Sequence, residues 1–332
     1  MKVSLILAIV SLLSAFSANA SLDSSIKAKG KLYFGNIIDG NTINDASVTN
    51  LLKSEFGAVT AEYSWKWPRI QPTRGVFNFQ ESDLVLNWAV ANKKLIRGHT
   101  FVWHQNIPEW VNAITDKATL TAVIQDHITK VAGRYKGKVY AWDVVNEVFE
   151  DNGSFRNSVF YRVLQEDFID IAFRAARAAD PAAKLYINEY GLDAAGPKID
   201  AFLALVGRLK SRGVPIDGLG TQSHLILGMV AGVPAQLQRL ANTGLDVAIT
   251  ELDIRIPKPV NDAKLAQQQL EYQSVIEGCL SVSKCVGISM WGVSDRNSWI
   301  DTTIPAFSAP LLWDNTFRRK LAFTGVDAIV AN

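Results

Sequence analysis

Short apolar runs alternate along the chain with longer segments in which apolar residues recur at helical spacing. The short runs are rich in β-branched and aromatic residues and predict eight strands: 32–38, 58–63, 95–101, 139–147, 184–190, 218–225, 246–253 and 286–293. The longer segments predict helices over 118–135, 168–180, 205–213 and 265–280. Two of these helices have common C-terminal signals, because Pro181 follows one and Gly213 ends another.

Eight strands, each followed by a helical stretch, match the count of a (β/α)8 barrel, so we expect an α/β fold consisting of a single TIM barrel. A doubly wound open sheet is the alternative arrangement of such elements. Those sheets usually have fewer strands and a glycine-rich first turn, and the sequence has neither feature. Since no linker rich in Pro, Ser and Thr interrupts the pattern, one domain is expected over residues 21–332.

Polar and aromatic residues gather at the C-terminal ends of the predicted strands. In a barrel these ends form one face, and active sites are built on that face. We therefore expect the site to draw on this set: Glu62, Tyr63, His99, Asn146, Glu147, Asn188, Glu189, Tyr190, Gln222, His224, Glu251, Asp253 and Trp291.

Residues 1–20 are typical of a secretory signal peptide. Lys2 precedes an apolar run that ends in Ala18-Asn19-Ala20, so we predict cleavage after Ala20. The run is too short for a membrane span, although a hydrophobic N-terminal helix is an alternative interpretation. The expected product is a secreted, extracellular protein without a membrane partner.

The two cysteines, Cys279 and Cys285, predict a disulfide, because a pair of cysteines in a secreted chain is usually oxidised. Two buried free thiols are the alternative. Asn152 begins an Asn-Gly-Ser sequon and is a predicted glycosylation site.

Composition narrows the choice of ligand. The chain has a formal charge of +2 without a basic block, which argues against a nucleic acid partner. Four His without ligand spacing, and the lack of a phosphate loop or dinucleotide fingerprint, predict neither a metal site nor a cofactor. Nine Trp are many for this length, and their flat rings suit sugars or aromatic ligands.

Two carboxylates stand at the ends of strongly apolar strands. Glu147 ends AWDVVNE and Glu251 lies near the end of VAITELD. A buried acid is costly unless it is hydrogen-bonded or used in chemistry. On the fourth and seventh strands, facing one mouth of the barrel, the two acids predict a catalytic pair, and carboxyl groups about 5 Å apart suit retaining glycoside hydrolysis.

Six stretches together resemble the family 10 glycoside hydrolases, the secreted xylanase family, and its fungal members in particular. They are GHTFVWHQNIPEW, YAWDVVNE, AKLYINEY, IDGLGTQSHL, VAITELDIR and GISMWGVSDRNSW. The resemblance extends over essentially the whole chain that follows the signal segment. It implies a monomeric enzyme with a plant oligo- or polysaccharide as its partner and substrate.

The resemblance also implies roles for individual residues. Glu147 looks like the general acid/base, and Glu251 looks like the nucleophile, which has to stay ionised. His224, held in turn by Asp253, is a candidate donor to Glu251. Asn146 is expected to bind the 2-hydroxyl of the reacting sugar.

The remaining residues implied by the resemblance surround the bound sugars. Walls of the reacting subsite are expected from His99, Trp103 and Gln222. The next sugar on the non-reducing side is expected to meet Glu62 and Lys66, together with Tyr63. An aromatic cage over the reacting rings is expected from Trp291 and Trp299, and Tyr190 is expected against the leaving-group sugar.

The stretch AEYSWKW departs from the family pattern, in which Asn usually stands at the position of Tyr63. Further departures are Trp65, Pro68, Asn106 and Glu189. A phenol cannot reproduce the paired donor and acceptor of an amide. Xylan is therefore the default substrate, and a glycoalkaloid such as α-tomatine, the substrate of family 10 tomatinases, is the alternative. A non-catalytic carbohydrate-binding or inhibitor barrel is a third hypothesis, against which the presence of both acids argues.

Several residues are expected to be structural. Trp88 and Trp142 lie within apolar patterns and are predicted core residues, and Asp143 is predicted to support the site from deeper in the barrel. His127 is predicted to lie on the surface of its helix. His104 has no predicted role.

Overall fold

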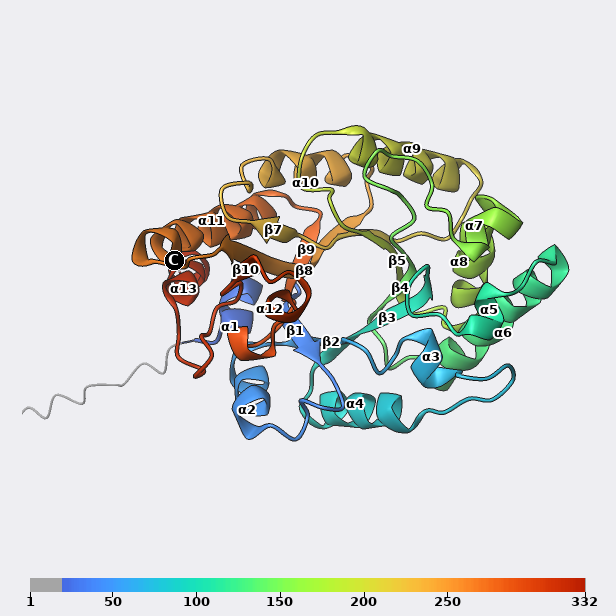
Figure 1. Ribbon diagram of the computed structural model, residues 1–332, viewed down its shortest axis with the longest axis horizontal. Helices are drawn as coiled ribbons and strands as arrows, with labels where there is room; N and C mark the ends of the chain where they lie inside the picture. Colours follow the sequence, from blue (N-terminus) through green and yellow to red (C-terminus); the bar gives the residue numbers. More distant parts are fainter. Residues whose placement is uncertain (1–19, 332) are drawn as a thin grey trace, which may run out of the picture.

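Eight parallel strands close into a barrel surrounded by helices (Figure 1). The computed structural model describes residues 20–331. The barrel strands are β1 (Tyr33–Ile38), β2 (Ala58–Ala61), β3 (Leu95–Trp103), β4 (Ala141–Asn146), β5 (Lys184–Glu189), β6 (Gly218–Thr221), β8 (Asp246–Pro257) and β9 (Cys285–Met290). Since β9 pairs with both β8 and β1, the ring is complete, and the predicted (β/α)8 barrel is confirmed.

One predicted strand is wrong in detail, because the segment 218–225 forms two strands. β6 ends at Thr221, and β7 (His224–Ile226) pairs with the outer part of β8. Ser223 between them has a φ of 58°, which breaks the extended path of the chain. β8 continues beyond the barrel, where β10 (Phe307–Ser308) pairs with its end.

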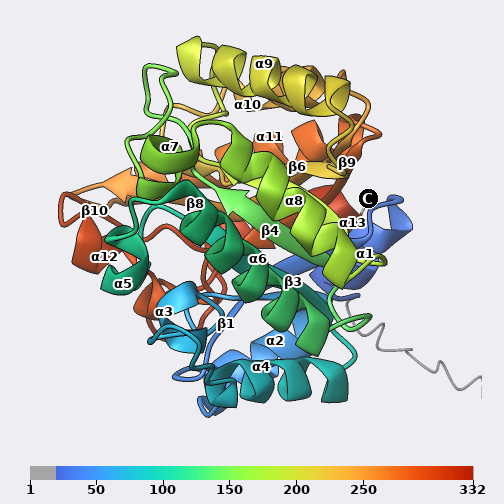
Figure 2. The same ribbon diagram turned by 90° about the vertical axis from the view of Figure 1, so that its right-hand side faces the viewer.

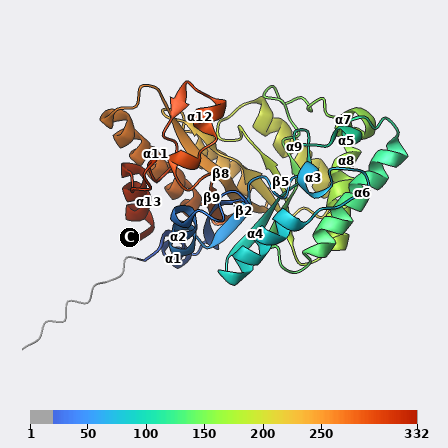
Figure 3. The same ribbon diagram turned by 60° about the horizontal axis from the view of Figure 1, so that its bottom comes forward.

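Helices cover the outside of the barrel, and short ones lie at its mouth. They are α1 (Leu22–Ala28), α2 (Ala46–Glu55), α3 (Trp67–Ile70), α4 (Gln80–Ala91), α5 (Glu109–Asn112), α6 (Lys117–Arg134), α7 (Val159–Leu164), α8 (Asp167–Ala179), α9 (Pro197–Ser211), α10 (Val233–Ala241), α11 (Asp262–Ser281), the 3₁₀ turn η1 (Asp295–Asn297), α12 (Ile300–Thr303) and α13 (Leu321–Ala331). Figure 2 shows α6 and α8 side by side against β3 and β4, and Figure 3 shows α11 and α13 on the opposite side.

Local sequence explains where several helices begin. The side chain of Asp116 accepts a hydrogen bond from Thr119 N at the start of α6, and Asn261 does the same for Lys264 N at the start of α11. Such caps satisfy backbone donors that the helix itself cannot. The predicted helix 205–213 is the second half of α9, which begins earlier, at Pro197, a residue well suited to a first helical turn.

The barrel strands are buried on both faces, as parallel strands covered by helices usually are. All six residues of β4 are buried. Trp142 from this strand packs against Phe101 with ring centroids 4.2 Å apart, which confirms it as a core residue. Gly98 on the paired strand leaves room for the indole, because a Cβ there would lie 2.1 Å from Trp142 Cε3.

The prediction for His127 is wrong, because this residue is fully buried. Its ring stacks on Trp67 at a centroid distance of 4.0 Å, and its Nδ1 lies 3.0 Å from Gln71 Oε1. Burial lowers the pKa of His127 to about 3, so the imidazole is neutral. Val123 and Val131 lie four positions to either side of His127, so the helical spacing places it on the buried face of α6, and only its polar character indicated the surface.

The predicted signal segment lies outside the described residues, apart from Ala20. Within residues 20–331, none of the helices combines the length and apolar character that a membrane span requires.

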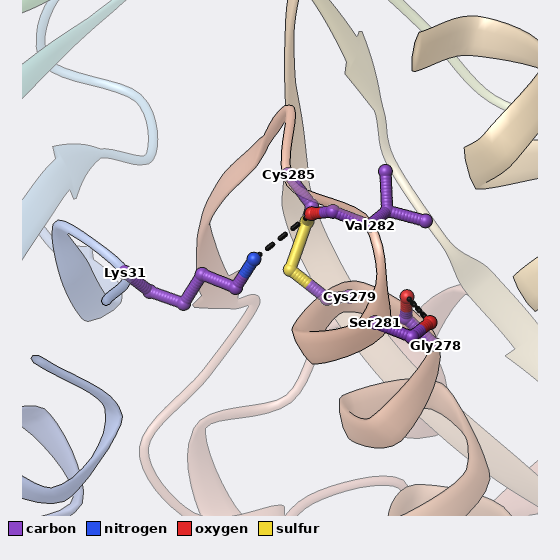
Figure 4. The surroundings of a disulfide bond; sticks show 6 residues. All are labelled: Lys31, Gly278, Cys279, Ser281, Val282 and Cys285. Carbon is purple, nitrogen blue, oxygen red and sulfur yellow. Dashed lines mark hydrogen bonds between the residues drawn. A yellow bond between two sulfur atoms is a disulfide. The ribbon is translucent and has the colours of Figure 1, made fainter. Parts of the chain in front are cut away.

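The predicted disulfide is present and joins the last turn of α11 to the start of β9 (Figure 4). Cys279 and Cys285 are both buried. The turn between them is also held from outside, because Lys31 Nζ donates to Val282 O over 2.9 Å. The disulfide therefore ties a helix to a barrel strand, and the loop between the two cysteines is also fixed by the hydrogen bond from Lys31.

Replacing both cysteines by alanine should lower the free energy of unfolding by about 2 kcal/mol, because a short loop removes little entropy from the unfolded chain. The sequence separation is only 6 residues. Equilibrium urea unfolding of the parent and the double variant measures the difference. A single variant, Cys279→Ala, should lose a similar amount, and unchanged stability in both variants would contradict the expectation.

Candidate active site

A cleft with a volume of about 580 Å³ lies at the carboxyl ends of the barrel strands. Its walls bring together residues from nearly every strand end and several loops. They are Glu62, Lys66, His99, Trp103, Gln105, Asn106, Asn146, Glu147, Arg156, Tyr190, Gln222, His224, Glu251, Arg255, Trp291, Trp299, Thr303 and Ile304. Of the predicted catalytic and sugar-binding residues, Tyr63 alone does not line this cleft.

Glu251 on β8 is buried and hydrogen-bonded through both carboxylate oxygens. Asn188 Nδ2 donates to Oε1 over 2.8 Å, and His224 Nε2 lies 3.1 Å from Oε2. The other ring nitrogen of His224 lies 2.8 Å from Asp253 Oδ2, and the same oxygen accepts from Trp299 Nε1 over 2.9 Å. Asp253 is therefore a support beneath the cleft, in contact with two of its wall residues.

The charges in this chain of contacts stabilise one another. Burial lowers the pKa of His224, but Asp253 and Glu251 together raise it to about 10, so its imidazolium donates from both ring nitrogens. Burial raises the pKa of Glu251, but the hydrogen bond from His224 and the charges of His99 and His224 bring it below its ordinary value. Glu251 is therefore an ionised carboxylate at neutral pH, as a nucleophile requires.

Glu147 follows directly after β4 and has a different environment. Its Oε2 accepts from Trp103 Nε1 over 2.7 Å, and its Oε1 accepts from Gln222 Nε2 over 2.9 Å. His104 Nδ1 lies 3.9 Å from Oε2. Burial and the charges of Arg156 and Lys198 lower the pKa of His104 to about 4, so this neighbour is a neutral ring.

Asn188 is a site residue to which the sequence analysis assigned no role. Its side chain is completely buried at the end of β5. Nδ2 donates to Asn146 Oδ1 over 3.0 Å as well as to Glu251, while Oδ1 accepts from Thr250 Oγ1 over 2.7 Å. Asn188 therefore sets the orientation of the Asn146 amide and of the Glu251 carboxylate together. Its position among the polar strand ends was the only signal for this role in the sequence.

Asp143 supports the wall of the cleft from below, as expected. The Arg97 guanidinium forms a two-pronged ion pair with it, and His99 Nδ1 lies 3.0 Å from Asp143 Oδ2. Burial raises the pKa of Asp143, but Arg97 and then His99 lower it below its ordinary value. A carboxylate that is ionised and fully paired has no free oxygen for catalysis, so its function is to hold His99.

Aromatic side chains form the walls of the cleft beside His224 and His99. Trp299 meets His224 edge-on at a centroid distance of 5.0 Å, and Trp291 meets His99 edge-on at 5.4 Å. Across the cleft, Tyr190 is fixed by its hydroxyl, which accepts from Arg156 Nη2 over 3.0 Å. Flat rings on both sides of the carboxylates suit a chain of sugar rings.

The stretch 61–67 divides between the core and two hollows. Trp65 and Trp67 are buried in the core, whereas Glu62 and Lys66 line the cleft. Tyr63 is 42% exposed and lines a neighbouring hollow of about 350 Å³ together with Asp39, Gly40, Asn41, Glu62, Lys66, Arg69 and Glu81. Since Glu62 and Lys66 line both hollows, the second one continues the cleft outward.

Among residues 20–331, no group of three or more His, Cys, Asp or Glu side chains is arranged to hold a metal ion. The chemistry that the cleft can perform with its own side chains is proton transfer and nucleophilic attack by its two carboxyl groups.

Comparison with known proteins identifies one family of glycoside hydrolases along nearly the whole chain. The sequence profile of glycosyl hydrolase family 10 matches residues 21–329. Endo-1,4-beta-xylanase A of Phanerodontia chrysosporium is 46% identical over 316 residues, covering 94% of this chain and 78% of that protein. Endo-1,4-beta-xylanase 2 of Claviceps purpurea is 46% identical over 310 residues, covering 93% and 91%.

Solved structures are similar over the same length. Xylanase 10B from Thermotoga petrophila, in complex with xylobiose, superposes with a TM-score of 0.92 at 30% identity, covering 95% of this chain and 98% of that one. A glycosylated endo-beta-1,4-xylanase from Gloeophyllum trabeum superposes with a TM-score of 0.89 at 34% identity, covering 95% and 100%.

The charge on His224 should make stability depend on pH. The folded chain keeps a proton with a pKa of about 10, whereas the unfolded chain releases it near the ordinary value of about 6.5. This contribution is therefore complete below pH ~6.5 and is lost as the pH rises toward 10, by at most ~1.4 kcal/mol per pH unit.

Urea unfolding of the parent and of His224→Asn between pH 6 and pH 10 measures the effect. The parent should be the more stable protein at pH 6, and the difference should shrink as the pH rises. A constant difference over this range would show that His224 is not held as an imidazolium.

Proposed function

Because the chain belongs to glycosyl hydrolase family 10, we propose that it is a secreted, retaining endo-1,4-β-xylanase that acts on plant cell-wall xylan. The observation that carries this proposal is the pair Glu147 and Glu251, two carboxyl groups that line one cleft in opposite environments. The xylanases named above, similar over more than nine-tenths of the chain, support the substrate.

The reaction proceeds in two displacements. Glu251 attacks the anomeric carbon while Glu147 gives its proton to the glycosidic oxygen, so the leaving chain departs as an alcohol. Water then attacks the glycosyl-enzyme, Glu147 takes up a proton from it, and Glu251 is released. Two inversions at the same carbon retain the configuration.

The contacts in the cleft suit this division of labour. The His224 imidazolium and Asn188 keep Glu251 ionised before the attack. The indole of Trp103 and the amide of Gln222 donate to Glu147 and stabilise the carboxylate that it becomes after giving up its proton. The amide of Asn146, oriented by Asn188, binds the 2-hydroxyl of the reacting sugar.

The sugars lie along the cleft on both sides of the carboxyl pair. Glu62 and Lys66 bind the sugar next to the reacting one on the non-reducing side, where Lys66 Nζ also lies 4.8 Å from the centre of the Trp103 ring. Trp291 and Trp299 cover the reacting sugar. Tyr190 packs against the leaving-group sugar.

A tomatinase-type reaction on a glycoalkaloid is the second candidate, and Tyr63 is the observation in its favour. The phenol replaces an amide in the family pattern. It lines the outer hollow and not the cleft, so it changes contacts beyond the reacting xylose and leaves the carboxyl pair unaltered. The position of Tyr63 favours xylan as the substrate at the reacting centre. It also favours an altered preference for the sugars that lie farther along the substrate.

We also propose that the chain is exported and glycosylated. The sequence of residues 1–20 supports export. Asn152 is exposed in the loop after β4, as a glycan attachment site has to be.

Xylan, an aryl xylobioside, an aryl cellobioside and α-tomatine should be compared with the purified protein. We expect xylan to yield short oligosaccharides and the aryl xylobioside to be cleaved faster than the cellobioside, because the extra hydroxymethyl group has to fit beside Glu62 and Lys66. α-Tomatine should remain intact. The anomeric configuration of the first product, followed by NMR, should be retained.

Cleavage of α-tomatine with little cleavage of xylan would overturn the choice of substrate in favour of the second candidate. In that case Tyr63→Asn should reduce cleavage of α-tomatine and increase that of xylan. Failure on all four substrates by the folded protein would favour a non-catalytic barrel.

Glu251→Ala should reduce turnover by more than ~10⁴-fold, because no other group can form the glycosyl-enzyme. Azide should restore activity by occupying the space of the lost carboxylate, and the glycosyl azide should have the inverted configuration. Glu147→Ala should still form the glycosyl-enzyme from substrates with good leaving groups. Full activity of Glu251→Ala would remove it from this role.

A further inference from the structure

The residue proposed as the proton donor begins a tight hairpin at positions 147–156. Phe149 and Phe155 pair across it, and Arg156 N donates to Val148 O over 2.8 Å. Glu147 itself has a φ of 56°. A residue with a side chain adopts this left-handed conformation only where its surroundings stabilise it, because it costs of order 1 kcal/mol or more. The groups that hold the hairpin therefore also hold the Glu147 carboxyl.

Glu189, completely buried at the end of β5, is one of these groups. Its Oε2 accepts from Phe149 N over 3.1 Å, and its Oε1 accepts from Tyr190 N over 3.2 Å. Lys198 Nζ lies 3.1 Å from the same Oε1. One carboxylate thus joins the hairpin, the residue proposed to face the leaving-group sugar, and the first turn of α9.

Lys198 completes the connection from the α9 side. Its side chain is only 5% exposed, yet its ammonium group has three acceptors. Besides Glu189, these are Asp151 Oδ1 at 3.4 Å and the face of the Tyr190 ring, whose centroid lies 3.1 Å from Nζ. Gly153 allows this close approach, because a Cβ there would lie 2.6 Å from Pro197 O.

Arg156 holds the hairpin from its other end. Nε donates to Glu147 O over 3.3 Å, and Nη2 donates both to Phe149 O over 2.8 Å and to Tyr190 Oη over 3.0 Å. Glu189 thus accepts a hydrogen bond from the backbone N–H of Phe149, and Arg156 donates one to its carbonyl. Phe149 lies two residues after the proposed proton donor. The same two side chains contact Tyr190, which lies where the proton has to be delivered.

We propose that Glu189, Lys198 and Arg156 form a positioning clamp that holds the carboxyl group of Glu147 against the leaving-group sugar packed on Tyr190. This rests on the roles proposed above for Glu147 and Tyr190. Proton transfer needs the carboxyl oxygen within about 3 Å of the glycosidic oxygen. The clamp fixes the donor through its backbone and the acceptor through the ring beneath it, so it serves the proton-transfer step and not the attack by Glu251.

The charges in the clamp agree with this arrangement. Burial raises the pKa of Glu189 to about 7; Lys198 acts to lower it, and the nearby charge of Glu147 acts to raise it. The two carboxyl groups are therefore close enough to influence each other. Removing the charge of Glu189 or of Lys198 leaves the other buried charge without its partner.

The test is the dependence of kcat/KM on the leaving group, measured with aryl xylobiosides from 2,4-dinitrophenyl to phenyl. A good leaving group departs without receiving a proton, whereas the departure of a poor one depends on the proton that Glu147 donates. Glu189→Gln keeps the shape but replaces one acceptor oxygen by an NH2 donor, which then faces either Phe149 N or the Tyr190 N and Lys198 Nζ donors. It should lose ~100-fold on the phenyl glycoside and less than ~3-fold on the dinitrophenyl glycoside, since general acid catalysis contributes about 10²–10⁴-fold. kcat/KM reports the first displacement, so the later water step does not enter.

Two matched variants separate positioning from stability. Glu189→Asp keeps a carboxyl group with two acceptor oxygens and should recover most of the activity on the phenyl glycoside. Lys320→Met breaks a comparably buried ion pair, in which Nζ lies 3.0 Å from Asp295 Oδ2 and neither residue lines the cleft. It should lower the melting temperature and change kcat/KM by one common factor across the series.

Equal losses on all leaving groups in Glu189→Gln, or no loss on any, would overturn the clamp. Where Glu189→Gln does not fold, Lys198→Met takes its place in the same series with the same criteria. A parent protein that hydrolyses none of these glycosides would instead overturn the proposed function, so the two failures can be distinguished.

Discussion

The buried charge of Glu251 is the constraint on which the rest of the site depends. An ionised carboxylate without partners in the interior costs several kcal/mol, so hydrogen-bond donors have to surround it. These donors come from other strands, namely Asn188 from β5 and His224 from β7, and Asp253 then balances the charge of His224. Asp253 follows Glu251 by two positions on β8, so strand alternation directs both side chains to the same face. The parallel pairing of β5 with β6, and of β6 and β7 with β8, brings the other two strand ends to that face.

The second carboxyl group differs from the first in backbone as well as in partners. Glu251 lies within β8, at a shift in its register with β9, whereas Glu147 has a left-handed conformation just beyond β4. Its contacts are two neutral N–H donors and a neutral histidine. The two acids of the cleft therefore differ in their hydrogen-bond partners, and different surroundings are the general feature of acid–nucleophile pairs. The charged residues that fix the hairpin of Glu147, Glu189 and Arg156, also contact Tyr190.

The segment after β2 shows how a few residues can serve the core and the cleft together. The indoles of Trp65 and Trp67 are buried, and they anchor a loop whose polar residues, Glu62 and Lys66, face the cleft. Tyr63 points to the adjoining hollow. A change of residue at this position can therefore alter contacts with a longer or bulkier substrate while the reacting centre stays the same.

The sequence by itself determined the (β/α)8 barrel, the placing of two acids at strand ends and the pairing of Cys279 with Cys285, because short apolar runs between amphipathic segments, polar strand ends and an isolated cysteine pair are local signals. It also indicated most of the cleft-lining residues. Only the tertiary structure decided the division of 218–225 into two strands, the bridging role of Asn188 and the neutrality of His104. Each of these depends on side chains that are distant in sequence; Asn188 Nδ2 and Glu251 Oε1, for example, are 63 positions apart. Burial and charge are properties of the assembled surroundings of a residue, and a sequence pattern describes only its neighbours along the chain.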